Sequence, residues 1–146
     1  MLVTTSLEGV PRGRPMAIAL YEDGLLYFAS RSEDEKLAEI LNHPEVAVTL
    51  QKQGMYLSIT GRARLETNTV LADRLWSPSM RLWFPEGPED RHLTLIVVEL
   101  LQSEYWDRRG LLHLQFLWEA GKAVVSAHKL DEDRLGGHAK VSPPEE

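Results

Sequence analysis

Apolar and polar residues alternate along several short stretches of the chain, which is the pattern of β-strands that bury one face. In residues 16–21, for example, Met16, Ile18 and Leu20 fall on the same face. Residues 93–101 are apolar almost throughout, which indicates a strand near the middle of a sheet. Strands are predicted at residues 2–7, 16–21, 25–29, 46–50, 56–65, 93–101 with a continuation to 107, and 112–117.

Helical spacing replaces this alternation in the stretches between some of the strands. In residues 36–42, Leu37, Ile40 and Leu41 share one side of a predicted helix. Pro44 ends this helix, because the residue before a proline is pushed out of the α region. Three further helices are predicted to begin after Thr67 or Asn68 as N-cap, after Ser77, and at Trp118.

Glycines mark two places where the chain is expected to turn or bend. Glu22-Asp23-Gly24 predicts a hairpin turn, and Gly61 falls where a long barrel strand would bend. Strands that follow each other through tight turns pair in antiparallel fashion. The sequence therefore predicts a mainly β fold, a six- to seven-stranded antiparallel β-barrel with three or four short helices at its rim.

The composition limits the classes of protein to which the chain can belong. Its 146 residues, 43% of them apolar, fit a single domain over residues 1–146, with a frayed tail at 142–146. A net charge of −6 argues against nucleic-acid binding, and no apolar run reaches the roughly 18 residues that a membrane span needs. The absence of cysteine excludes disulfides and favours a cytoplasmic protein. The five histidines lack the spacing of a metal site, so no metal is expected.

The region around the first predicted helix carries groups that could bind a small anion. Arg14 opens a predicted strand, hydroxyl-bearing residues follow the next strand, and Lys36 begins the helix. Backbone N–H groups at a helix start, together with two cations, can form a phosphate site. Residues 33–35 are all acidic, however, and would compete with a bound dianion. Lys36 could also form an ordinary surface ion pair with Glu33 or Glu39.

Four segments follow one another along nearly the whole chain. They are residues 12–36, Trp76 with residues 83–90 (Trp-Phe-Pro-Glu-Gly-Pro-Glu-Asp), residues 104–107 (Glu-Tyr-Trp-Asp) and residues 137–141 (Gly-His-Ala-Lys-Val). In this order they resemble the pyridoxamine 5'-phosphate oxidase-like split barrels, and most closely their general stress protein 26 group. The resemblance implies a homodimeric split β-barrel with FMN in two equivalent sites, each built from both chains. It also implies flavin-dependent redox chemistry on an unidentified small molecule and a link to stress response.

The same resemblance implies which residues contact FMN. The residues that correspond to phosphate ligands are Arg14, Ser30, Ser32 and Lys36. Those that correspond to positions along the flavin ring are Pro15, Met16, Ala17, Phe28 and Ala29. Those that correspond to positions facing the cofactor of the other subunit are Tyr56, Ser58 and Trp106. Structural alternatives stay open: a solvated strand end for Arg14, core packing for Phe28 and Trp106, and a polar barrel exterior for Tyr56 and Ser58.

Two alanines and the acidic loop depart from the pattern of the family. Ala29 stands where the family usually has Thr, and Ala19 where it has Lys or Gln, so each removes a polar contact to flavin or phosphate. Three functions remain open: a flavin-dependent oxidoreductase, a non-enzymatic flavin-binding stress protein, and a cofactor-free interaction module. A deazaflavin or haem in the same cleft is disfavoured, because the loop is acidic and no histidine can be placed as an axial ligand.

Overall fold

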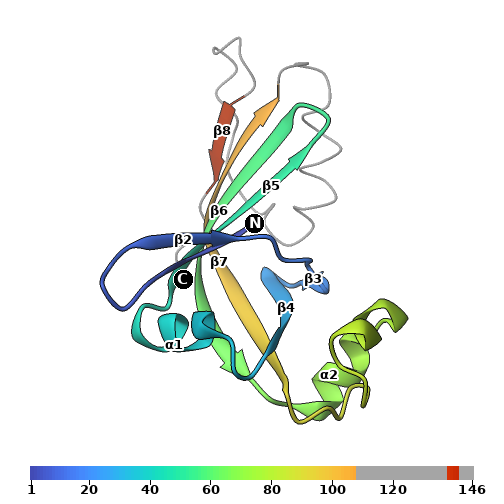
Figure 1. Cartoon of the computed structure of the whole chain (residues 1–146). Helices are drawn as coiled ribbons and strands as arrows, with labels where there is room; N and C mark the ends of the chain where they lie inside the picture. The colour runs from blue at the N-terminus through green and yellow to red at the C-terminus, as the bar shows by residue number, and fades with distance from the viewer. Residues whose placement is uncertain (108–137, 142–146) are drawn as a thin grey trace.

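The computed structural model describes residues 1–107 and 138–141, and in these residues eight strands form one antiparallel sheet (Figure 1). The strands are β1 (Leu2–Thr5), β2 (Pro11–Arg14), β3 (Leu20–Glu22), β4 (Leu25–Arg31), β5 (Glu45–Lys52), β6 (Met55–Glu66), β7 (Leu93–Asp107) and β8 (His138–Val141). Their order is β2-β1-β5-β6-β7-β4-β3, with β8 also paired to β7. The predicted mainly β, antiparallel fold is therefore confirmed.

The two edge strands of this order, β2 and β3, are consecutive in the chain, which forces the sheet to curl. Only residues 15–19 join them, and the six Cα steps from β2 to β3 reach at most about 22 Å. Seven strands laid flat, about 4.8 Å apart, would separate the same edges by about 29 Å. The sheet must therefore bend toward closure, as a barrel does.

Two α-helices and one 3₁₀ helix lie in the described residues: α1 (Glu35–Asn42), α2 (Thr69–Leu75) and the 3₁₀ helix Pro78–Leu82. Asn68 is the N-cap of α2, since its Oδ1 accepts hydrogen bonds from the N–H groups of Val70 at 2.9 Å and Leu71 at 3.1 Å. Ser77 precedes the 3₁₀ helix without a side-chain cap bond. Over residues 1–107 and 138–141, no helix has the length and apolar character needed to cross a membrane.

The curled sheet has a core on each face. The inner core contains side chains from five strands and from α1, and the outer core lies between β4, β7, α2 and the 3₁₀ helix. β7 contributes to both: Ile96 and Val98 point inward, whereas Leu95 and Val97 point to the outer core. All four are at most 1% exposed. The prediction of a central strand is confirmed, and its two faces are both covered.

Glycine is required at both places that the sequence indicated. Asp23 and Gly24 have φ of 50° and 76°, which gives a hairpin turn whose twist matches that of its strands. The β6–β7 register shifts between Thr60 and Gly61. A Cβ on Gly61 would lie 2.6 Å from the carbonyl oxygen of Glu99, which leaves room for glycine only. The predicted turn and bend are both confirmed.

The predicted strand at residues 16–21 is wrong for most of its length, because residues 15–19 belong to no strand. The alternation behind the prediction exists: Met16 and Ile18 pack against the inner core, and Ala17 and Ala19 are exposed. These residues link opposite edges of the sheet and therefore do not run beside a strand for long. An extended segment alternates in burial whether or not it joins a ladder.

Predictions for the last third of the chain have a mixed outcome. β8, which pairs with residues 103–106 of β7, was missed because four residues give too short a pattern to recognise. The predicted strand at 112–117, the helix at 118–129 and the tail at 142–146 lie outside the described residues.

Candidate functional site

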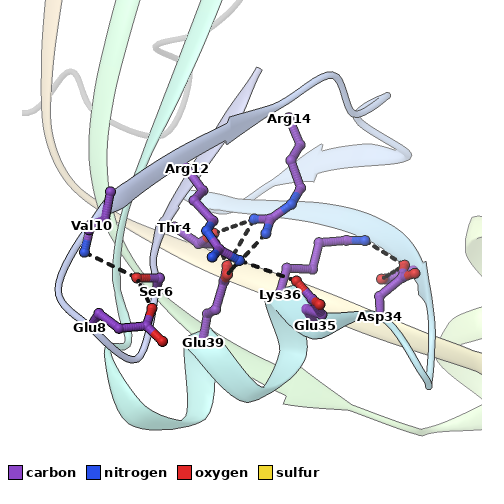
Figure 2. A network of polar contacts seen from close by, with 11 residues as sticks. Thr4, Ser6, Glu8, Val10, Arg12, Arg14, Asp34, Glu35, Lys36 and Glu39 are labelled. Atoms are coloured by element: carbon purple, nitrogen blue, oxygen red, sulfur yellow. Dashed lines mark hydrogen bonds and ion pairs between the residues drawn. The ribbon is translucent and has the colours of Figure 1, made fainter.

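Arg14 and Glu39 form the centre of a polar cluster where β1, β2 and α1 meet (Figure 2). The guanidinium of Arg14 donates from Nη1 to Glu39 Oε2 at 2.8 Å and from Nη2 to Oε1 at 3.0 Å. Thr4 Oγ1 donates to Glu39 Oε2 at 2.5 Å, and Arg12 Nη1 donates to Oε1 at 3.2 Å. Glu39 is only 3% exposed, so these donors replace the water that its charge loses on folding.

These contacts hold Glu39 in its ionised form. Its pKa falls to about 2, chiefly because Arg14 donates hydrogen bonds to it; burial acts in the opposite direction, and the bond from Thr4 lowers the pKa further. The bonds with Glu39 also raise the pKa of Arg14. Arg14 is therefore not the solvated strand-end residue that the sequence left open. It ties β2 to α1.

A second polar cluster surrounds Asp34 at the start of α1. Its Oδ2 accepts hydrogen bonds from Ser30 Oγ at 2.8 Å, from the backbone N–H of Arg31 at 3.2 Å, and from Lys36 Nζ. Burial of Asp34 opposes its ionisation, but the bonds from Lys36 and Ser30 outweigh this, and its pKa is lowered. The partner of Lys36 is therefore Asp34 rather than either glutamate suggested by the sequence.

Each of the four cations in this region is in an ion pair. Arg12 pairs with Glu35 and Glu39, Arg14 with Glu39, Arg31 with Glu33, and Lys36 with Asp34. Four carboxylates thus balance four cations. The region contains the donors that a phosphate needs, but it presents no excess positive charge.

The residues predicted along the flavin ring are spread over different environments. Phe28 is 1% exposed in the inner core, and its neighbour Ala29 packs against the outer core. Pro15 and Ala17 are exposed, and Met16 is half-buried. Only Pro15, Met16 and Ala17 therefore offer accessible surface beside Arg14, and a contact between Phe28 and a ligand stays a prediction.

Ser32 lies apart from the other predicted phosphate ligands. Its hydroxyl donates to Glu33 at 3.2 Å, and its backbone N–H donates to the carbonyl oxygen of His92 at 2.8 Å. It lines a hollow of about 280 Å³ between the start of α2 and residues 88–95, which the sequence did not indicate. The structure thus brings Arg14, Ser30 and Lys36 to α1 but leaves Ser32 on a different surface.

Tyr56, Ser58 and Trp106 line a hollow of about 220 Å³ near the turn that joins β5 to β6. Tyr56 lies opposite Trp106 in the β6–β7 ladder, and they are 39% and 37% exposed. Ile59 points into the inner core, so Tyr56 and Ser58 point to the outer side of the sheet. Arg14 and its partners on α1 lie on the inner side. One chain therefore does not bring these two groups of predicted ligands together.

Glu39 and Thr4 were not identified as site residues from the sequence. The spacing of α1 placed Leu41 on the buried side, but Leu41 is 72% exposed and Glu39 is buried. That prediction is wrong because the ion pair with Arg14 allows a carboxylate to occupy a position facing the barrel. A local pattern carries no signal for this, since the partner of Glu39 is 25 residues away.

The fold and the polar clusters at α1 define a small split-barrel protein. The sequence profile of the family described as "Pyridoxamine 5'-phosphate oxidase like" matches residues 1–131. This chain belongs to that family, as its sequence motifs predicted.

Individual relatives agree with this membership. General stress protein 26 of Bacillus subtilis (strain 168) is 30% identical over 102 residues, which cover 64% of this chain and 72% of that protein. The crystal structure of general stress protein 26 from Bacillus anthracis str. Sterne has a TM-score of 0.65 at 27% identity, covering 71% of this chain and 81% of that one. A general stress FMN/FAD binding protein from Xanthomonas citri has a TM-score of 0.62 at 23% identity, covering 74% and 80%, and this likeness concerns the fold.

Proposed function

We propose that this protein binds a flavin, with FMN as the expected form, and that the flavin carries out redox chemistry on a small molecule. One observation carries the proposal: three donors at the start of α1 converge on a single anionic oxygen. They are the Ser30 hydroxyl, the Arg31 backbone N–H and the Lys36 ammonium. This set of donors has the chemistry to bind a phosphate monoester. Membership of the family and the flavin-binding relative from Xanthomonas citri support the same function.

The donors fit a phosphate in kind, but they have carboxylate partners. Ser30 and Lys36 can donate to a phosphate only when Asp34 moves away. Arg14 keeps its hydrogen bonds to the buried Glu39 and therefore does not donate to the phosphate. In this proposal Ser30 and Lys36 hold the phosphate, and Arg14 positions α1. A bound flavin supplies the electron transfer, and the residues of the chain bind and orient it.

The proposal includes a homodimer in which each site takes residues from two copies. Tyr56, Ser58 and Trp106 lie on the outer side of the sheet, and Lys36 lies with α1 on the inner side. A two-fold symmetric dimer can place Tyr56, Ser58 and Trp106 of one copy beside Lys36 of the other copy. The same contact then forms twice, because each subunit contributes its outer side to one site and its inner side to the other.

Thermal unfolding of the purified protein during a titration with FMN, together with its visible spectrum, tests flavin binding. At 100 times the dissociation constant, a ligand stabilises the fold by about 2.7 kcal/mol, or about 5–10 °C for a domain of this size. Lys36→Ala is expected to weaken binding, and Arg81→Ala, which removes an exposed cation from the 3₁₀ helix, serves as control. Arg14→Ala is unsuitable because it leaves the buried charge of Glu39 without its main partner.

A cofactor-free interaction module is the second candidate, because every cation near α1 is already neutralised. A colourless, folded protein whose melting temperature does not respond to FMN would favour it. If flavin binds, aerobic oxidation of NAD(P)H by the flavin-loaded protein separates an oxidoreductase from a non-enzymatic flavin-binding protein. The cytoplasmic location stays a prediction from the absence of cysteine.

A further inference from the structure

Asp34 is the N-cap residue of α1, yet its side chain makes no cap bond to the helix. The carboxylate turns toward the preceding loop instead, where Oδ2 accepts from Ser30 Oγ at 2.8 Å and from the Arg31 N–H at 3.2 Å. Figure 2 shows the Lys36 side chain directed at the same carboxylate. One oxygen of the chain itself thus receives all three donors that a bound phosphate would use.

The exposure of these groups indicates how an outside anion can reach the donors. Ser30 is 3% exposed and the side chain of Lys36 is 11% exposed, whereas the side chain of Asp34 is 34% exposed. Asp34 is therefore the group that can swing into solvent. An anion gains Ser30 and Lys36 only by replacing the Asp34 carboxylate.

The neighbouring charges do not assist this replacement. Arg12, Arg14 and Arg31 are engaged with Glu35, Glu39 and Glu33. A phosphate dianion that enters would meet the displaced carboxylate beside it, and Lys36 would be the one cation of this cluster without another carboxylate partner. Like charges at such short range repel, and the repulsion is strong where water is partly excluded.

We propose that Asp34 is a built-in competitor for the flavin phosphate and thereby sets the specificity of the site. The phosphate of FMN then gains less from Ser30 and Lys36 than these donors could supply, and this chain prefers FMN to riboflavin by less than about tenfold. The inference rests on the proposed flavin-binding function and adds to it the residue that governs selection between flavins.

Two variants that remove one negative charge each test the role of Asp34. Asp34→Asn keeps the size of the side chain but frees Lys36 from its ion pair. Glu33→Gln removes a charge one residue earlier, where the side chain is 50% exposed and contacts Arg31 and Ser32 instead. Glu33→Gln is therefore a matched control for the general effect of charge in this loop.

Dissociation constants for FMN and riboflavin are measured by flavin fluorescence for the wild type and both variants. The wild type and Glu33→Gln are expected to bind FMN more tightly than riboflavin by less than about tenfold. Asp34→Asn is expected to bind FMN about tenfold more tightly, since charge-assisted bonds to phosphate become available, with riboflavin binding unchanged.

Two results would overturn the role of Asp34 and leave flavin binding intact. One is a preference of the wild type for FMN over riboflavin of about tenfold or more, and the other is Asp34→Asn protein that binds FMN no more tightly than the wild type does. Binding of neither flavin to any of the three proteins would overturn flavin binding itself. Inorganic phosphate then tests Asp34 independently, through melting temperatures at matched ionic strength. Phosphate is expected to stabilise Asp34→Asn selectively, and equal responses of all three proteins would contradict the proposal.

Discussion

Glu39 is a buried carboxylate on α1 that binds β1 through Thr4 and β2 through Arg14. Its pKa is about 2 in the folded protein, and a glutamate in an unfolded chain has a pKa of about 4.3. The difference corresponds to a contribution on the order of 3 kcal/mol to the free energy of unfolding. Because the folded state has the lower pKa, this stability is present above about pH 4.5 and is lost as the pH falls through about 2.

We predict that Glu39→Gln lowers the free energy of unfolding by about 3 kcal/mol at neutral pH, because it removes the charged partner of Arg14. The gap to the wild type should narrow between about pH 4.5 and 2, as the wild-type carboxyl becomes protonated. Urea unfolding at a series of pH values measures this. Glu35→Gln, at a side chain that is 82% exposed, is the matched control, and an equal effect of both variants would contradict the assignment.

The sequence predicted that Arg14, Ser30 and Lys36 lie near each other at α1, but it did not predict which carboxylates they contact. Arg14 and Lys36 were recognisable because strand ends and helix starts are local features. The partner of Arg14 is Glu39, 25 residues away, and this pairing depends on how β2 lies over α1. The partner of Lys36, Asp34, is only two residues away. The rotamer of Lys36 decides whether its ammonium group contacts Asp34 or a neighbouring glutamate, and the sequence does not show that rotamer.

At the scale of elements, the start of α2 depends on one cap. Asn68 accepts two backbone hydrogen bonds, whereas the side chain of Ser77, which precedes the 3₁₀ helix, accepts none from the backbone of that helix. We predict that Asn68→Ala lowers the free energy of unfolding by about 1 kcal/mol, because two N–H groups lose their partner. Ser77→Ala should change it little. Urea unfolding of both variants measures the difference, and equal losses would contradict the assignment.

At Gly61, where the register of β6 against β7 shifts, there is no room for a side chain. A Cβ there would lie 2.5 Å from Val98 Cγ1 and 2.6 Å from the carbonyl oxygen of Glu99. We predict that Gly61→Ala lowers the free energy of unfolding by about 1–3 kcal/mol through the backbone shift that it forces. Gly13→Ala is the control, because its closest contact is the flexible end of Met1. Thermal unfolding of the two variants distinguishes these cases, and comparable melting temperatures would argue against the close approach.

Most strands could be predicted because burial on one face leaves a period of two in the sequence. The glycines of the hairpin and the bend could be predicted because their backbone requirements are local. The absence of residues 15–19 from any strand could not be predicted, because these residues differ from a strand in what lies beside them rather than in pattern. β8 could not be predicted because four residues give too short a pattern. Pairing is a property of the assembled sheet.

For the whole molecule, the outer surface near Trp106 is predicted to contact both a second copy and its flavin. Trp106 is 37% exposed and lies beside Tyr56. Trp83, the C-cap residue of the 3₁₀ helix, is 57% exposed. We predict that Trp106→Ala weakens dimerisation and raises the dissociation constant for flavin, because aromatic groups contribute strongly to interfaces. Trp83→Ala serves as the control. Sedimentation at several protein concentrations measures dimerisation, and a stable monomer for the wild type would contradict the prediction.

Sedimentation velocity of the wild-type protein mixed with FMN, recorded at the visible absorbance of the flavin, tests flavin binding by a homodimer most directly. This measurement reports flavin binding and the size of the species that carries it at the same time. We expect the flavin to sediment with the protein as a dimer, with one flavin for each chain at saturation. Flavin that remains at the meniscus while folded protein sediments without it would contradict the central claim.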